Sequence, residues 1–418
     1  MFTRIQALRF RCLRYVNQRL GRFATLVGPN ASGKTTFLDV VAFLGELAKG
    51  GGKVVDAVRE RSASFHHLLW LGEGDSFQLA VEAGLPDAIR RMLRPDLADY
   101  THVRYEIEVG MDAESNEIGL NHEVLWLMTD TPTAQRQSEL FPAPVKPPGT
   151  LFLKAGKGRK MILTNRPGRN ANYYSDGRNT YNPSFKLGRD TAAVANIPAD
   201  RENYHAAPWF RDLLADGIQN LALKSIRMRE ASPPGLGRSF VSDGSNLPWL
   251  VDELRKDAVR FGQWIDHVRT ALPDVEDITV VERPDDRYRY VVIHYSGGAQ
   301  VPSWLVSDGT LRLLALTILA YIKNSPGGIM VEEPENGIHP RAIETAMQSL
   351  SSIYNGQVLL ATHSTVALNM LDPADVLCFA KDASAATDIV SGDVHPALQD
   401  WKRGEPEFGV LFASGILS

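Results

Sequence analysis

Eight residues near the start of the chain have the spacing of a phosphate-binding loop. Gly28–Thr35 reads GPNASGKT and matches the pattern GxxxxGK[ST] in full. Its glycines let the backbone curl so that several N–H groups point at one phosphate. Lys34 would reach the β- and γ-phosphates, and the Thr35 hydroxyl would ligate Mg²⁺. The sequence therefore predicts a site for ATP and Mg²⁺, with nucleotide contacts from Gly28, Pro29, Asn30, Ala31, Ser32, Gly33, Lys34, Thr35 and Thr36.

The residues on either side of this loop predict the elements that it needs. Residues 22–27 (RFATLV) indicate a strand, and residues 34–48 carry apolar side chains at helical spacing until a glycine triplet at 50–52. Such a helix presents its positive N-terminal end to a phosphate. A plain glycine-rich turn before a helix is the alternative, but the strand–loop–helix order favours phosphate binding.

Two acidic residues follow a second buried-strand pattern. Residues 328–332 (GIMVE) form a short apolar run typical of a central parallel strand, and Glu333 comes next. Acids at the carboxyl end of a strand beside a phosphate-loop strand hold Mg²⁺ or orient the attacking water. We predict that Glu332 belongs to the magnesium shell and that Glu333 is the general base. The alternative is an ordinary acidic loop after a buried strand.

A histidine ends the next predicted strand. His363 follows residues 357–361 (QVLLA), one helix and one strand after the acids. There it would reach the γ-phosphate or the attacking water. A lone histidine at a strand end is usually structural, but this spacing favours a catalytic role, together with Lys34 and Glu333.

The segment Ser307–Thr310 (SDGT) precedes a strongly apolar helix predicted at 311–323. Serine in this position caps a helix. A serine hydroxyl, the Gly309 backbone N–H and a helix N-terminus also make an anion site. Both interpretations can hold together, and capping is the simpler one for the segment by itself.

The rest of the chain has a mixed pattern without internal repeats or sustained heptads, which argues against a long coiled coil. We predict a hairpin from residues 276–282 and 288–295. Further strands are predicted at 4–10, 76–83, 101–110, 121–128, 150–164 and 375–380, and further helices at 207–222, 246–272 and 340–354.

Composition limits the class of protein. The 418 residues are 44% hydrophobic and 22% charged, as in soluble globular proteins, and the net charge of −4 excludes a globally basic nucleic-acid binder. Two cysteines, Cys12 and Cys378, exclude a disulfide framework and fit a reducing cytosol. The longest apolar run, Leu313–Ile322, is too short to cross a bilayer. We therefore expect a cytoplasmic protein without a membrane partner.

Residues 151–190 are locally basic. They contain nine Lys or Arg residues against two acids, Asp176 and Asp190, with tyrosines and a phenylalanine between them. Basic residues pair with phosphates and aromatic rings stack on bases, which would suit DNA or RNA. A solvated sheet edge and a surface for a partner protein are the alternatives. The basic residues are Lys154, Lys157, Arg159, Lys160, Arg166, Arg169, Arg178, Lys186 and Arg189.

Taken together, the ordered motifs GPNASGKT, SDGT, MVEEPENGIHP and ATHS resemble the ABC-type ATPase heads of the SMC/RecF class. The likeness is strongest to stand-alone ATPases related to the OLD proteins, and it covers about 1–83 and 240–380. It implies that Glu332 and Glu333 are Walker B acids, that Glu335–Gly337 form a D-loop and that His363 is a switch histidine. It also implies that the region of Arg11 and Cys12 approaches the base and ribose.

The resemblance implies a dimer as well. Ser307 and Gly309 match the signature, which contacts the γ-phosphate of a nucleotide held by the opposite subunit. The signature is SDGT rather than the LSGGQ of transporters, and Gln78 is a weak candidate for the Q-loop glutamine. The coiled coil of SMC proteins and the Toprim nuclease of OLD proteins have no counterpart here. An effector would then come from another chain.

The expected fold is an α/β ABC-type P-loop ATPase head with a mixed α+β insertion. The expected regions are 1–83 with the P-loop, 84–240 as the insertion, and 241–418 with the signature, Walker B acids and switch histidine. We expect an ATPase that acts as a nucleotide-gated switch, in a homodimer or higher oligomer through ATP-sandwiched heads. The first hypothesis for its role is the sensor or scaffold of a prokaryotic anti-phage system with a separate nuclease or toxin. A RecF-like DNA-repair ATPase is the alternative; a transporter subunit and a non-catalytic scaffold are less favoured.

Overall fold

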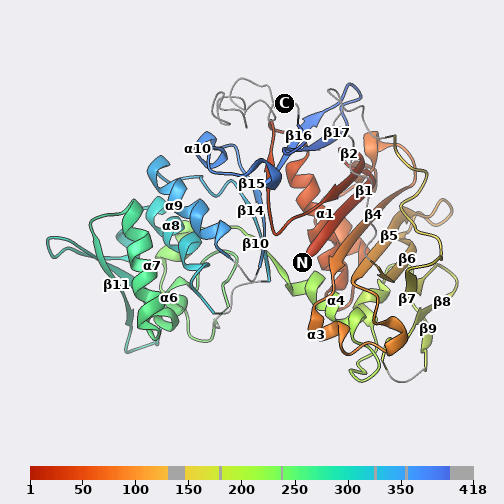
Figure 1. Cartoon of the computed structure of the whole chain (residues 1–418), viewed down its shortest axis with the longest axis horizontal. Coiled ribbons are helices and arrows are strands. Elements are labelled where there is room, and N and C mark those ends of the chain that lie inside the picture. Colours follow the sequence, from red (N-terminus) through yellow and green to blue (C-terminus); the bar gives the residue numbers. More distant parts are fainter. Residues whose placement is uncertain (130–145, 178–180, 237–238, 324–326, 354–355, 396–418) are drawn as a thin grey trace.

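The computed structural model describes residues 1–129, 146–177, 181–236, 239–323, 327–353 and 356–395. Figure 1 shows a sheet-rich lobe, built mainly from the first half of the chain, and a helical lobe around α6–α9. The two lobes meet at a central sheet. No helix in the described ranges is both long and apolar enough to span a membrane.

The central sheet has six strands in the order β10-β14-β15-β3-β16-β17. All of its neighbouring strands are parallel except the last pair. The register pairs Glu332 with Ala361, and Ala361 with Leu26, so the carboxyl ends of three strands lie at one edge. The bounds are β10 Ile218–Leu221, β14 Gly328–Glu332, β15 Gln357–Ala361, β3 Phe23–Val27, β16 Val376–Lys381 and β17 Thr387–Ser391.

An antiparallel sheet of eight strands forms the second layer, in the order β2-β1-β4-β5-β6-β7-β8-β9. β5 to β9 come from the region 84–240 and extend the sheet that β1, β2 and β4 begin. The bounds are β2 Leu13–Arg19, β1 Phe2–Phe10, β4 Ser76–Gly84, β5 His102–Met111, β6 Ile118–Met128, β7 Arg159–Asn165, β8 Asn170–Tyr173 and β9 Ser184–Lys186.

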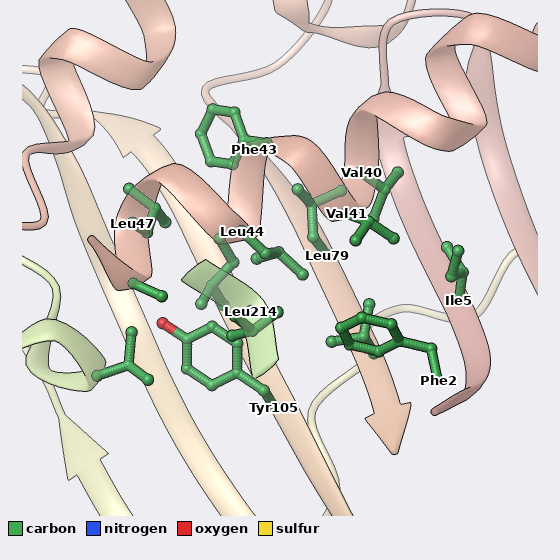
Figure 2. Close-up of a cluster of buried hydrophobic side chains, with 14 of the residues drawn as sticks. Phe2, Ile5, Val40, Val41, Phe43, Leu44, Leu47, Leu79, Tyr105 and Leu214 are labelled. Atoms are coloured by element: carbon green, nitrogen blue, oxygen red, sulfur yellow. The ribbon is translucent and has the colours of Figure 1, made fainter. Parts of the chain in front are cut away.

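Helix α1 (Lys34–Ala48) joins the two sheets through the main hydrophobic core. Its apolar residues repeat at helical spacing, and ten of its fifteen residues are buried, so the helix contacts neighbours on most of its circumference. In Figure 2, Val40, Val41, Leu44 and Leu47 of α1 lie in one apolar cluster with Leu79 and Tyr105 of the antiparallel sheet. Helix α4 (Ala206–Asp216) packs beside α1. This packing fixes the N-terminal end of α1, where the P-loop begins the helix.

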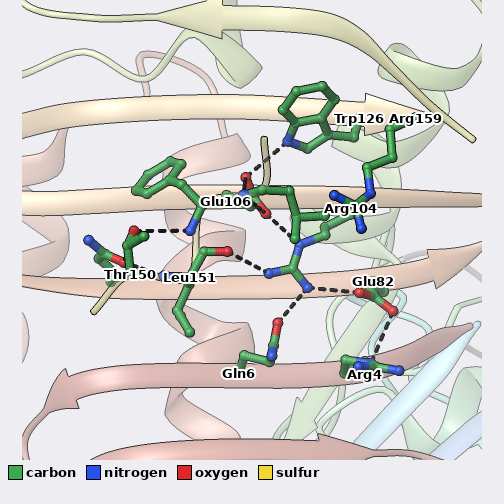
Figure 3. Close-up of polar contacts among 12 residues, drawn as sticks. Arg4, Gln6, Glu82, Arg104, Glu106, Trp126, Thr150, Leu151 and Arg159 are labelled. Carbon is green, nitrogen blue, oxygen red and sulfur yellow. Dashed lines mark hydrogen bonds and ion pairs between the residues drawn. The ribbon is translucent and has the colours of Figure 1, made fainter. Parts of the chain in front are cut away.

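The outer face of the antiparallel sheet carries a buried charge network (Figure 3). Arg104 forms ion pairs with Glu106 at 2.5 Å and with Glu82 at 2.7 Å, and Trp126 Nε1 donates to Glu106 at 2.9 Å. The segment Thr150–Leu153 lies across these residues. Leu151 O accepts from Arg104 Nη2 at 3.0 Å, and the backbone N–H of Leu153 donates to Glu106. Burial of these charges therefore depends on a backbone segment that satisfies them.

The helical lobe has its own apolar core around α8 (Asp308–Ile318). The buried Trp264 donates Nε1 to Thr317 Oγ1 at 3.0 Å, which ties α7 to α8. Its other elements are α5 Ser225–Arg229, α6 Leu247–Arg255, α7 Ala258–Ala271, β11 Val275–Glu282, β12 Arg289–Tyr295, β13 Gln300–Pro302, η5 Ser303–Leu305 and α9 Pro340–Ser351. The short helices elsewhere are α2 Val54–Arg59, η1 Phe65–Leu68, η2 Trp70–Gly72, α3 Asp87–Arg90, η3 Pro95–Leu97, η4 Ala193–Asn196, α10 Thr365–Leu368 and η6 Pro373–Asp375.

The helix predicted at 340–354 ends at Ser351, and four other predicted elements differ more clearly from the structure. The helix predicted at 207–222 ends at Asp216, and residues 218–221 form β10, because pairing with β14 overrides their helical pattern. The helix predicted at 246–272 is two helices, with Asp257 capping the second by accepting from Arg260 N. The strand predicted at 150–164 begins only at Arg159, since residues 150–153 bond to side chains instead. The helix predicted at 311–323 begins three residues earlier and ends at Ile318.

Candidate nucleotide-binding site

A cleft of about 730 Å³ opens at the carboxyl edge of the central sheet. Nine of the predicted site residues line it: Asn30, Ala31, Gly33, Lys34, Thr35, Thr36, Glu332, Glu333 and His363. They come from three segments, 30–36, 332–333 and 363, and the parallel register brings the first segment next to two that lie about 300 residues later in the chain. Gly28, Pro29 and Ser32 lie in the same loop without lining the cleft.

Neighbouring strands fix the shape of the P-loop from behind. A side chain at Gly28 would overlap the carbonyl oxygen of Phe379 on β16, and one at Gly33, where φ is +106°, would overlap Thr387 on β17. Thr387 Oγ1 donates to the carbonyl oxygen of Ser32 at 2.8 Å. Only glycine therefore fits at both ends of the loop, for reasons of close packing and backbone conformation.

Lys34 lies against its own loop. Its Nζ donates to Gly28 O at 2.8 Å and to Pro29 O at 3.0 Å. Burial lowers the pKa of the Lys34 ammonium, and the carboxylates of Glu333 and Glu332 oppose that shift. The ammonium thus lies against two carbonyl oxygens of the loop and within the electrostatic influence of two acids.

Thr35 and Glu332 are the candidate magnesium ligands, and they are in direct contact. Thr35 Oγ1 donates to Glu332 Oε2 across the sheet edge. A hydroxyl and a carboxylate supply the hard oxygen atoms that Mg²⁺ prefers. No cluster of three or more His, Cys, Asp or Glu side chains suited to a metal occurs in the described ranges. The pair fits Mg²⁺ that takes its remaining ligands from phosphates and water.

Glu333 has a constrained conformation. Its φ is +47°, in the left-handed region that non-glycine residues rarely adopt, and its backbone N–H donates to Ala361 O at 2.7 Å. Asn336 Nδ2 donates to Glu333 Oε2 at 2.5 Å, and Glu333 Oε1 lies 3.8 Å from His363 Nε2. The carboxylate is thereby held between an amide and an imidazole, at the mouth of the cleft.

Glu335 fixes the turn that carries His363. One of its oxygens, Oε1, accepts both from Thr362 Oγ1 at 2.7 Å and from the His363 backbone N–H at 2.9 Å. The pKa of the His363 imidazole is lowered, mainly by burial and then by Lys34, while Glu333 and Glu335 oppose the shift. The neutral imidazole is therefore favoured in this site.

The chain matches a known protein family over most of its length. A family model described as "AAA domain, putative AbiEii toxin, Type IV TA system" matches residues 23–369. The chain belongs to this AAA-domain family. Comparison with curated proteins gives no significant match.

Two solved structures share the fold of this AAA-domain chain. One is an SMC head bound to the C-terminal winged-helix domain of ScpA, at 14% identity and a TM-score of 0.53, covering 93% of this chain and 97% of the other. The second is an SMC head with an extended coiled coil, bound to the C-terminal domain of ScpA and derived from Pyrococcus furiosus. It has 10% identity and a TM-score of 0.51, over 96% and 98% of the two chains. The predicted fold class, an ABC-type P-loop ATPase head, is thus confirmed.

The signature segment of the AAA-domain chain lies away from its own cleft. Ser307 caps α8: its Oγ accepts from Thr310 N at 3.2 Å, as the capping interpretation predicts. Neither Ser307 nor Gly309 lines the cleft. A side chain at Gly309 would overlap Gly337 O, so the signature packs directly on the loop after Glu333. The structure brings Ser307 and Gly309 together with that loop, but not with their own P-loop.

One wall of the cleft was not predicted. His66, His67, Leu69, Leu71 and Gly72 line it beside Arg11 and Cys12, which the resemblance had placed near the base, and Lys381 lines it as well. Residues 65–72 form two short 3₁₀ helices, which lack the periodicity that reveals a longer element. The weak Q-loop candidate, Gln78, does not line the cleft. Its side chain instead bonds to Glu108 and Leu151 on the outer sheet face.

Proposed function

We propose that this chain binds ATP with Mg²⁺ in the cleft and hydrolyses it. The observation that carries the proposal is the convergence of Lys34, Thr35, Glu332, Glu333 and His363 at one sheet edge. These side chains supply a cation for phosphate oxygens, two oxygen ligands for the metal, a base and a hydrogen-bonding imidazole. That set is what phosphoryl transfer to water requires.

Each group has a separate role in the proposed reaction. The P-loop N–H groups and Lys34 hold the β- and γ-phosphates, while Thr35 and Glu332 hold Mg²⁺, which would neutralise phosphate charge. Glu333 accepts a hydrogen bond from the attacking water and draws off its proton. His363, neutral in this site, orients the water or a γ-phosphate oxygen.

We further propose that hydrolysis needs two copies. Ser307 and Gly309 are absent from the wall of their own cleft, which supports a role over the nucleotide of a second copy. An exchange of this kind is reciprocal, so it produces a closed two-fold dimer with two nucleotides at its seam. Nucleotide binding would close the dimer and hydrolysis would release it.

The decisive experiment compares the wild-type chain with Lys34→Ala and Glu333→Gln. We expect phosphate release from the wild type alone, no ATP binding by Lys34→Ala, and ATP-bound dimers that persist in Glu333→Gln. Ser307→Arg should also stop turnover, but without trapping the dimer. Unchanged ATP affinity in Lys34→Ala would contradict the proposed ATP site. Full activity of a strictly monomeric protein would contradict the proposed need for two copies.

For the biological role, we propose a sensor or scaffold in prokaryotic defence against phage, acting on a separately encoded effector. The family description names a toxin of a type IV toxin–antitoxin system, and the related SMC heads are described as bound to ScpA. Both descriptions support a head that works with other proteins. Purification from the native operon followed by mass measurement tests this: a large assembly with a second protein supports it, and a pure homodimer that binds DNA ends contradicts it.

Direct binding of nucleic acid is the second candidate. Six basic side chains are exposed within 151–177 and 181–190: Lys154, Lys157, Lys160, Arg166, Arg169 and Lys186. Both acids of this region are engaged, since Asp176 accepts from the backbone of His205 and Ala206, and Asp190 binds Lys53 at 2.5 Å. Tyr181 of the same region is exposed as well. Arg178, also predicted to take part, lies outside the described residues.

A further inference from the structure

Three large apolar side chains are exposed beside the signature segment. Leu305 and Trp304 on η5 have 70% and 51% of their surface exposed, and Ile226 on α5 has 69%. The two elements are in contact, and Ser303 Oγ donates to Arg229 O at 3.0 Å. We call Ile226, Trp304 and Leu305 the signature-side patch. Side chains of this kind are more often buried, and neighbouring exposed apolar side chains are typical of a surface that contacts another protein.

The patch is held in place from both sides. Ser303 and Val306, which flank Trp304 and Leu305, are buried. Arg229 donates to Val306 O at 3.1 Å through Nη2 and pairs with Asp308 at 2.6 Å. The Trp304 ring also lies 4.8 Å from the ring of Tyr290. The patch is therefore a formed surface, and it is fixed relative to the signature.

A second exposed apolar side chain lies at the nucleotide cleft. Leu71 is 67% exposed, lines the cleft, and has φ of +54° in the left-handed region. Its segment is bonded to the β1–β2 turn, where Arg11 N donates to Leu68 O at 2.9 Å and Phe10 bridges to Leu69. The conformation is unfavourable for leucine, so the surrounding contacts must impose it. They hold an apolar side chain at the rim of a polar site.

We propose that Leu71 of one copy packs against Trp304 and Leu305 of the other when ATP joins two heads. This rests on the proposed dimer, in which Ser307 of one copy covers the cleft of the other. Leu305 precedes Ser307 by two residues, a span of about 7 Å at most. Leu71 lines the same cleft that Ser307 must reach. The two exposed apolar sites therefore meet at the seam, twice in each symmetric dimer.

Such a contact would explain why both sites are exposed in one copy. It buries apolar surface next to the nucleotide and excludes water from the seam. Burial of one leucine side chain is enough to change a dissociation constant by about tenfold or more. A separate effector is the competing occupant of the signature-side patch, and the experiment below distinguishes the two.

The test uses the full chain with Glu333→Gln as parent, and measures the dimer dissociation constant with ATP and Mg²⁺ by analytical ultracentrifugation. Leu305→Glu and Leu71→Lys should each weaken the dimer by about tenfold or more. In an equimolar mixture, the mixed dimer has one Leu71–Leu305 pair and one Lys–Glu pair. It should therefore form more readily than either variant alone. Val259→Glu, at a 71% exposed site on α7, is the matched control and should match the parent.

The outcomes are separable. Leu305→Glu should bind a fluorescent ATP analogue as the parent does, which shows that the fold and the P-loop are intact. If Leu305→Glu dimerises as tightly as the parent, the proposed contact is wrong. The same holds if the mixture dimerises no more tightly than either variant alone. Neither result contradicts the ATP-dependent dimer itself. Loss of a co-purified protein from Leu305→Glu with the dimer unchanged assigns the patch to an effector and also overturns it. Absence of any ATP-dependent dimer in the parent removes the contact together with the proposed function.

Discussion

Asn336 holds the carboxylate of Glu333, with 2.5 Å between Asn336 Nδ2 and Glu333 Oε2. The same residue donates its backbone N–H to Glu333 O at 3.0 Å. The candidate base is therefore oriented by a residue three positions later in the chain. The turn formed by residues 333–337 also packs on the signature segment, because Gly309 lies against Gly337.

Replacement of Asn336 by alanine should slow ATP turnover by between about tenfold and a hundredfold, because the Glu333 carboxylate loses its orientation. ATP affinity should change little, since Asn336 does not line the cleft. Single-turnover hydrolysis and equilibrium binding measure the two effects separately. Asn336→Asp should be slow as well, since an ionised carboxylate cannot donate the hydrogen bond that Asn336 Nδ2 gives to Glu333 Oε2. Equal losses of affinity and turnover would contradict this positioning role.

Glu335→Gln should shift the pH dependence of turnover. The negative charge of Glu335 raises the pKa of His363, so its removal lowers that pKa further. If the neutral imidazole is the active form, the acidic limb of the kcat–pH profile moves to lower pH. Glu344→Gln, at an exposed position on α9, is the control and should leave the profile unchanged. A shift of the acidic limb to higher pH would contradict the predicted direction of the change in the His363 pKa.

Gly309→Ala should destabilise the fold by about 1–3 kcal/mol, because the added methyl group overlaps Gly337 O and forces the signature away from the catalytic turn. The comparison is Gly262→Ala in α7, where a Cβ meets nothing within 4 Å. There alanine should stabilise by about 0.5–1 kcal/mol. Urea denaturation measures both changes. A stabilising Gly309→Ala would mean that the close approach to Gly337 does not exist.

Arg104→Met should cost about 3–5 kcal/mol of unfolding free energy, because it leaves the buried Glu106 without its charge partner. Addition of Glu106→Gln should recover part of this loss, since the amide keeps an acceptor for Leu153 and Trp126 without a charge. Arg227→Met, which breaks an exposed ion pair with Glu230, should change stability by less than about 1 kcal/mol. Denaturant titration of the four proteins tests the series.

If DNA or RNA binds residues 151–190, the affinity should fall steeply with salt. Neutralising Lys157, Arg159 and Lys160 should reduce the slope of log K against log salt by about one unit for each lost phosphate contact. Lys256, Arg260 and Lys323, exposed in the helical lobe, provide a control triple. A salt slope that is equal in both triple variants would favour the solvated-edge interpretation.

Much of the site could be predicted from sequence because its chemistry is local. The P-loop, the acids at the end of β14 and the histidine after β15 each occur with a short strand pattern, and parallel register aligns the strand ends. The fold class followed from the order of these motifs. Strand β10 could not be predicted, since its residues continue a helical pattern and only pairing with β14 makes them a strand.

Other features depend on contacts between distant segments. Residues 65–72 form a wall of the cleft through backbone bonds to the β1–β2 turn, and their sequence has no periodicity. The segment Thr150–Leu153 was predicted to be part of a strand, yet its backbone bonds to side chains. Only the family resemblance implied that Ser307 serves a cleft other than its own, since a motif by itself does not reveal its distance from another motif.

The P-loop is supported by Thr387, a residue far along the chain. Its hydroxyl holds the carbonyl of Ser32, and its side chain fills the space behind Gly33, although the two residues are 355 positions apart. A nascent polypeptide still attached to the ribosome would thus carry the phosphate-binding motif long before it carried the residue that supports it. The loop would gain this support only once synthesis has passed β17.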